Sequence, residues 1–410
     1  MMKQYFDGLV AGIEQGLAAE TGEKSPRKIY ALAVARLGSR LYAGDGKHRV
    51  AWCGVTAPFD LLASMGVTSC FVEFVGAVLA GTGAADGLLH KVEEAGYGPD
   101  TCAYHRAVIA AARDGLMPVP DFLVATSSPC TGGLAVMETL ARLFKRDLYV
   151  LHVPQDESPE SVNYLADQMR ELTDFVSFHT KEPLDRDRLA RAAEYSNEAR
   201  ELMIEAYRHS MAVPSPVAGK TLANFGVVMA LLLGTQEAVT VARAFRDDFA
   251  RKVERGEGGA GVEKFRLLWI QNRIQFKNDI LDFLEKEWGA VVVADELNAI
   301  TFGPIDPADP FPGFARRSIS IPLNGPVERR IEHLTQMCRD FSIDGAVTPC
   351  HWGCRQGTGG RSMIGEGLKA AGIPVLNLDV DCVDKRNFAP GQIKTRLEAF
   401  IEMLGQGKEI

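Results

Sequence analysis

The sequence has neither an excess of positive charge nor a long apolar run. Its 45 Lys and Arg face 53 Asp and Glu, a formal net charge of −8, and nucleic-acid binding usually needs a basic face. The longest apolar run, VVMALLLG at 227–234, is far shorter than the ~20 residues of a membrane helix. Asp7, Glu14 and Glu20 interrupt the N-terminal stretch, unlike a signal peptide. We therefore expect a cytoplasmic protein with no nucleic-acid or membrane partner.

The usual paired-cysteine motifs are also missing. The sequence contains neither the Cys-x-x-Cys-His of c-type haem attachment nor a thioredoxin-like Cys-x-x-Cys. Of the eight cysteines only Cys350 and Cys354 form a close pair, whereas a structural zinc site usually has two such knuckles. Structural disulfides are rare in a reducing compartment. The thiols are thus expected to be buried core residues, metal ligands or nucleophiles.

Short apolar runs alternate with helical patterns, which predicts an α/β fold with two Rossmann-like open parallel sheets and an additional helical segment. The expected units are N-terminal helices at 1–45, a first α/β domain at 46–180, a helical segment at 181–260 and a second α/β domain at 261–410. The two α/β halves look alike in pattern, which suggests related domains.

Seven strands are predicted, with helices between them. The strands are Arg49–Trp52, Phe122–Thr126, Leu148–His152, Phe265–Ile270, Val291–Ala294, Gly345–Thr348 and Pro374–Leu378. The helices include Pro58–Met65, Ala103–Arg113, Leu134–Phe144, Ser158–Ser177, Gln275–Trp288, Pro326–Phe341, Ser362–Ala371 and Gly391–Leu404, with a helix-rich stretch at Leu184–Lys252. The proline-rich run 303–314 is expected to be a connection.

Six cysteines occupy positions typical of ligands. Five lie just beyond predicted strands, namely Cys53, Cys130, Cys350, Cys354 and Cys382, and Cys102 begins a helix. Ligands of open α/β sheets bind at the carboxyl ends of the strands, and a helix N-terminus favours a thiolate. Dispersed thiolates and nearby glycines suit an iron–sulfur cluster. Cys70, in an apolar run, and Cys338, within a helix, are expected to be core thiols.

At these residues the sequence resembles the 2-hydroxyacyl-CoA dehydratase and benzoyl-CoA reductase superfamily. The resemblance covers most of the chain: VTAPFDLLASMG at 55–66 is similar to the family's P-x-E-L-L-x-A-x-G, and further matches are 101–115, the Cys130 turn, Cys354 and the C-terminal end. It implies two Rossmann-like domains and an iron–sulfur cluster on Cys102, Cys130 and Cys354. It also implies an ATP-hydrolysing activator protein as the electron donor.

The additional cysteines depart from the dehydratase pattern. HWGCRQ and LDVDCVD look more like the double-cubane cluster proteins of the same superfamily. That resemblance implies an [8Fe-9S] cluster on Cys53, Cys102, Cys130, Cys350, Cys354 and Cys382, with Cys70 as the alternative to Cys350. It makes the protein an ATP-dependent oxidoreductase component, expected as a homodimer, that reduces a small molecule. The alternative is a dehydratase or reductase subunit with one [4Fe-4S] cluster, and a zinc-binding structural protein is a third class.

Two histidines are candidate catalytic residues. His105 lies one helical turn after Cys102, and His351 lies within the CHWGC segment. Both are expected to donate protons near the cluster, and a buried, hydrogen-bonded histidine is the plainer alternative for His105. Trp352 is expected to shield the cluster or simply to pack, and Asp381 to cap a turn. The glycine run 357–360 lacks the Lys-Ser/Thr of a P-loop, so we expect ATP to bind the partner.

Overall fold

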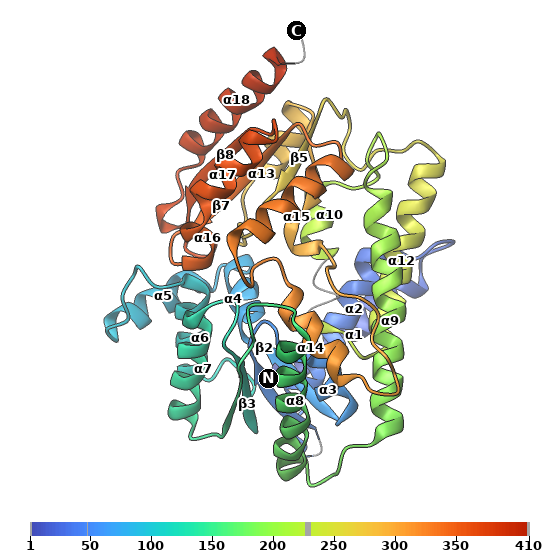
Figure 1. Cartoon of the computed structure of the whole chain (residues 1–410), viewed down its shortest axis with the longest axis vertical. Coiled ribbons are helices and arrows are strands. Elements are labelled where there is room, and N and C mark those ends of the chain that lie inside the picture. The colour runs from blue at the N-terminus through green and yellow to red at the C-terminus, as the bar shows by residue number, and fades with distance from the viewer. Residues whose placement is uncertain (1, 47, 226–230, 408–410) are drawn as a thin grey trace.

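Two four-stranded parallel sheets form the framework of the molecule, one above the other in Figure 1. The computed structural model describes residues 2–46, 48–225 and 231–407. The first sheet has the order β2-β1-β3-β4 and the second β6-β5-β7-β8. Their strands are β1 (Arg49–Cys53), β2 (Val67–Phe71), β3 (Phe122–Thr126), β4 (Leu148–Leu151), β5 (Phe265–Trp269), β6 (Ala290–Asp295), β7 (Gly345–His351) and β8 (Val375–Val380). The two sheets thus share one topology, as expected from the sequence.

Helices cover both sheets and join them. They are α1 (Met2–Ala18), α2 (Pro26–Leu41), α3 (Phe59–Ser64), α4 (Val72–Gly81), α5 (Ala85–Glu94), α6 (Ala103–Arg113), α7 (Thr131–Phe144), α8 (Pro159–Thr180), α9 (Arg186–His209), α10 (Gly219–Phe225), α12 (Gln236–Glu254), α13 (Ile280–Asp282), α14 (Phe311–Ser320), α15 (Val327–Asp340), α16 (Arg355–Gly359), α17 (Arg361–Ala370) and α18 (Pro390–Gln406). Among the described helices none alone could span a membrane, and α4 and α5 pass that test only as a pair bent by 119°.

The structure corrects the sequence prediction at one strand and at the proline-rich run. Strand β2 was missed because a largely apolar run continues from it directly into α4, and periodicity does not separate strand from helix in such a run. The proline-rich connection is shorter than predicted, because α14 begins at Phe311 with Pro312 in its first turn, a position that suits proline. Residues 226–230, inside the helix-rich stretch and the apolar run, lie outside the described residues.

Two further corrections concern the second sheet. Strand β7 does not end at Thr348 but continues to His351, which pairs with Val380 of β8. The predicted helix Gln275–Trp288 begins later than expected: residues 271–279 form an irregular loop, and the helical part consists of α13 and a π-helical turn at Phe283–Glu287. Tertiary contacts override the helical pattern there, since the Gln275 backbone N–H donates to the Cys382 carbonyl at 2.8 Å.

Segments far apart in sequence share the core beside the first sheet. One face of that sheet packs against α8 and α14, with Phe314 and Ile319 fully buried, and α9 runs alongside (Figure 1). The opposite face packs against α6 and α7. A larger core surrounds the second sheet and includes residues of α9, α12, α15 and α18. The chain therefore returns to the first sheet at α14 before completing the second.

A buried ion pair holds α14 against α3 beside the first sheet. Asp60 of α3 is fully buried and accepts two hydrogen bonds from Arg317 of α14, at 2.6 and 2.7 Å. Ser196 of α9 donates a third at 2.9 Å. Asp60 therefore connects α3 to both α14 and α9.

Replacing Arg317 with Met should leave Asp60 as an unpaired buried charge. We expect the free energy of unfolding to fall by about 3 to 5 kcal/mol, measured by urea unfolding. The control is Arg243→Met, which breaks an exposed pair with Glu198 and should cost about 1 kcal/mol or less. Equal losses in the two variants would contradict this role of the buried ion pair.

Candidate functional site

Three cysteines occupy the N-cap positions of three helices. Cys102 caps α6, Cys130 caps α7 and Cys354 caps α16. The Cys130 and Cys354 sulfurs each accept the backbone N–H of the glycine three residues later, Gly133 and Gly357, at 3.3 Å. Unpaired N–H groups and the dipole at a helix N-terminus favour negative charge. The glycine N–H groups therefore favour negative charge on the Cys130 and Cys354 sulfurs, in opposition to the effect of burial.

Cys130 and Cys354 occupy corresponding places in the two sheets. Each follows the third strand of its sheet, β3 or β7, at the carboxyl edge, where open α/β sheets bind ligands. The loop after β7 reaches the first unit at Gly353, where a Cβ atom would collide with the backbone of Cys102. Only glycine permits this approach, which brings the second sheet's loop against the start of α6.

His351 connects Cys102 to Cys382. It is fully buried, and its Nδ1 atom accepts the backbone N–H of Cys382 at 3.0 Å. A backbone N–H can only donate, so Nδ1 carries no proton and the ring proton is on Nε2. Nε2 lies 3.4 Å from the Cys102 sulfur. His351 therefore donates a hydrogen bond to this sulfur, with the Tyr104 ring edge-on at 5.3 Å.

His105 lies beside two of the thiols and next to Glu73, a residue that the sequence analysis did not predict. Its ring interacts with the Cys102 and Cys130 sulfurs and packs against Gly132. Nε2 of His105 lies 3.4 Å from Oε1 of Glu73 on α4. The signal for Glu73 was a single charged residue inside the apolar run that holds Cys70. The His105–Glu73 pair places an exchangeable proton beside the thiols.

The three thiols differ in acidity. Burial tends to raise the pKa of Cys102, but His105 and His351 outweigh it and lower that pKa to about 5. Burial raises the pKa of both Cys130 and Cys354 above the usual value, although the glycine N–H groups act in the opposite direction. Without a metal the site therefore holds one thiolate and two thiols near neutral pH.

Of the other predicted ligands, Cys382 lies nearest to this group. It is fully buried after β8, and burial raises its pKa, as do Asp381 and the Cys354, Cys102 and Cys350 sulfurs. The structure thus brings Cys382 together with Cys102 and Cys354. Asp381 accepts the N–H groups of residues 383 and 384, as expected of a turn cap.

Cys350 and Cys53 face other surroundings. Cys350 lies within β7 rather than after it, and strand alternation points it to the opposite sheet face from His351. Its sulfur lies 3.5 Å from the Thr348 carbonyl. Cys53 is the last residue of β1 and interacts with Ser69, Glu73 and Cys70. The structure therefore places Cys53 beside Cys70, and Cys350 near Cys382 rather than beside a helix-capping cysteine.

Trp352, two arginines of the segment after β7 and the two expected core thiols lie outside this group. Trp352 is 45% exposed, so it lies at the surface rather than as a buried shield. Arg361 pairs with Asp379 and interacts with Cys350. Arg355 is largely exposed. Cys70 and Cys338 are buried among apolar side chains, as expected of core thiols.

The three capping cysteines offer sulfur donors with backbone N–H groups beside two of them. In the described part of the chain, no three His, Cys, Asp or Glu side chains converge as ligands of a single ion. A tetrahedral zinc needs its sulfur donors about 2.3 Å from one point. The irons of a cluster are spread over a larger volume, and thiolates with N–H donors are its usual surroundings. The capping cysteines therefore fit an iron–sulfur cluster.

The low pKa of Cys102 predicts an unusual pH profile in cluster-free protein. Above a pKa of about 5 this residue is already a thiolate, so its alkylation rate by iodoacetamide should be nearly constant from about pH 6 to 8. The rates at Cys130 and Cys354 should rise roughly tenfold per pH unit over that range. Mass spectrometry of the alkylated peptides measures each rate, and a common profile for all three would contradict the assignment.

Comparison with known proteins gives the family. A family model described as 2-hydroxyglutaryl-CoA dehydratase, D-component, matches residues 54–404. The chain is 24% identical over 384 residues to the (R)-phenyllactyl-CoA dehydratase alpha subunit of Clostridium sporogenes, covering 90% of this chain and 93% of the relative. It is 24% identical over 361 residues to a benzoyl-CoA reductase subunit of Thauera aromatica, covering 78% and 80%. These matches confirm the superfamily resemblance, and the chain belongs to the 2-hydroxyglutaryl-CoA dehydratase D-component family.

Proposed function

We propose that this chain is the cluster-holding component of an iron–sulfur reductase or dehydratase, with Cys102, Cys130 and Cys354 as the cluster ligands. The observation that carries this proposal is the placement of all three thiols at helix N-termini, where two sheets of the same topology meet. Family membership supports it, since relatives are named as dehydratase and reductase subunits.

Backbone N–H groups and histidines of this chain would stabilise the negative charge of a bound cluster and hold protons beside it. A cluster bound here would supply electron transfer at low potential. The N–H groups of Gly133 and Gly357 stabilise negative charge on two of the sulfurs. His351 holds a proton at Nε2 facing Cys102, and His105 holds one beside Glu73. These two histidines are our candidate proton donors.

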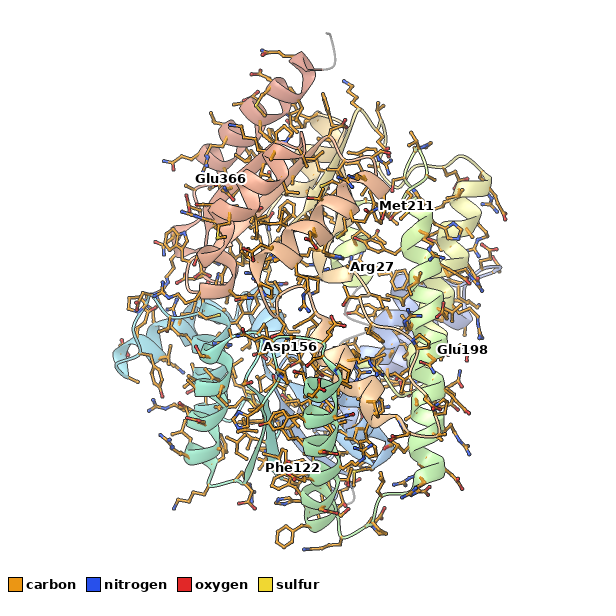
Figure 2. The ribbon with its side chains drawn as sticks, viewed as in Figure 1. Arg27, Phe122, Asp156, Glu198, Met211 and Glu366 are labelled. Atoms are coloured by element: carbon orange, nitrogen blue, oxygen red, sulfur yellow. The ribbon has the colours of Figure 1, made fainter. Side chains whose placement is uncertain are left out.

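A cavity along the loop 273–278 supports a small-molecule substrate. It has a volume of about 380 Å³ and is lined by that loop together with Arg27 and Lys220; Figure 2 labels Arg27. The same loop contacts Tyr104 of α6, whose hydroxyl donates to the Arg273 carbonyl at 3.2 Å. Lys220 pairs with Asp282 and Arg273 with Asp295, so the lining is polar with partly balanced charge, which favours a small polar substrate.

The proposed partners of this chain are an ATP-hydrolysing activator protein and a second subunit. The glycine run at 357–360 has no P-loop lysine, which agrees with ATP hydrolysis on a separate activator protein that delivers the electrons. Most oligomers of soluble proteins are symmetric, which favours a homodimer for a double-cubane protein, whereas a dehydratase or reductase subunit would pair with a second, different subunit.

An [8Fe-9S] double cubane, with reduction of a small molecule as the reaction, is the second candidate. The observation that favours it is the proximity of Cys382 to Cys102 and Cys354, with Cys350 also close to Cys382. Cys53 and Cys350 would have to change orientation to complete six ligands. The single [4Fe-4S] cluster of a dehydratase-type component requires no such change and is the assignment that the geometry supports best.

Iron analysis of anaerobically purified protein tests the proposal. We expect brown, oxygen-sensitive protein, and Cys130→Ala or Cys354→Ala should lose most of its iron because each removes a ligand. The matched control is Cys338→Ala, which removes a core thiol of α15 and should keep the iron content. Colourless wild-type protein without iron, or iron loss only in the control variant, would contradict the proposal.

Cys382→Ser separates the two cluster types. Serine is a much poorer ligand for soft metals than cysteine. About four irons per chain, unchanged by the substitution, supports the single cluster. About eight irons, falling to roughly half or less in the variant, supports the double cubane instead.

A further inference from the structure

Gln271 donates a hydrogen bond to one of the three thiols. It follows β5, is buried, and has a φ of +50°, which is uncommon for a residue other than glycine. Its Nε2 atom lies 3.5 Å from the Cys354 sulfur. The amide also packs against Gly357, where a Cβ atom would lie 3.1 Å from its oxygen. The backbone conformation and the glycine thus both serve to place this amide.

Arg330 of α15 fixes which way the amide points. Its Nη2 atom donates to Oε1 of Gln271 at 3.0 Å. A guanidinium has only donors, so the amide oxygen must face Arg330 and the NH₂ group must face the sulfur. The assignment of the amide oxygen and nitrogen of Gln271 therefore follows from the donor-only chemistry of Arg330.

Glu296 holds Arg330 in place. It accepts hydrogen bonds from Nε and Nη2 of Arg330 at 2.6 and 2.8 Å. Glu296 and Arg330 are both almost completely buried, and a buried ion pair is costly to maintain unless its hydrogen bonds are well formed. The hydrogen bonds from Glu296 through Arg330 to Gln271 thus hold the NH₂ group of the Gln271 amide toward the Cys354 sulfur.

We propose that Gln271 is a positioning residue that stabilises negative charge at Cys354 and raises the reduction potential of the cluster bound there, with Arg330 and Glu296 fixing its amide. This rests on the proposed function. Hydrogen bonds to cluster sulfurs are one of the determinants of reduction potential. Cys130 and Cys354 each accept the N–H of a glycine, Gly133 or Gly357, and the Gln271 amide is an additional donor at Cys354.

The test compares Gln271→Met with wild type by redox titration monitored by electron paramagnetic resonance. Methionine keeps the length of the side chain and removes the donor. The reduced state should become less favourable by up to about tenfold, which lowers the potential by about 59 mV for one electron. In cluster-free protein the same variant should slow Cys354 alkylation, because the hydrogen bond from the amide to this sulfur is lost, and leave Cys130 unchanged.

The control is Gln336→Met, which makes the same substitution at an exposed glutamine of α15 and should leave the potential unchanged. Gly357→Ala is a second variant, since its methyl group displaces the Gln271 amide but keeps the backbone N–H, and it should lower the potential in the same direction. An unchanged potential in Gln271→Met with full iron content overturns this inference alone. If the wild type binds no iron, the proposed function fails. In that case the alkylation of cluster-free protein decides the positioning role, and an unchanged Cys354 rate in Gln271→Met overturns it.

Discussion

The site depends on the contact between the carboxyl edges of two parallel sheets. All strands of a parallel sheet end at one edge, and the helices that follow them begin there. Cys130 and Cys354 begin such helices in different sheets, and Cys102 begins a helix between them. Gly353 closes the arrangement, because any side chain there would collide with Cys102. Three helix N-termini therefore face one small region.

Burial of negative charge is the cost of this arrangement, and hydrogen bonds offset it. A buried ion loses several kcal/mol of solvation, while a hydrogen bond to a charged group returns about 1.5 to 3 kcal/mol. Cys102, beside two histidines, has a lowered pKa, whereas the pKa values of Cys130 and Cys354 are raised. A metal group that takes all three sulfurs must displace protons from two of them, so its binding weakens as the pH falls.

The sequence predicted the framework better than the side-chain directions. Strand and helix patterns predicted two alike α/β halves, and the cysteines after strands pointed to one sheet edge. Cys350 shows the limit: the extra residues of β7 form only because β8 pairs with them, and strand alternation then turns this thiol away. Gln271 and Glu73 gave almost no sequence signal, since their roles arise from contacts between segments distant in the chain.

The two halves share a topology but supply different chemistry to the thiols. On the first-sheet side, His105 and Glu73 can exchange protons with the region around Cys102 and Cys130. On the second-sheet side, the Gln271 amide does not ionise and the Arg330 guanidinium offers only donors, so Cys354 is contacted by fixed dipoles. His351 is the exception, and its proton faces Cys102 rather than Cys354. Proton delivery is therefore confined to the Cys102 side of the site, and Cys354 lies where charge is stabilised by fixed dipoles alone.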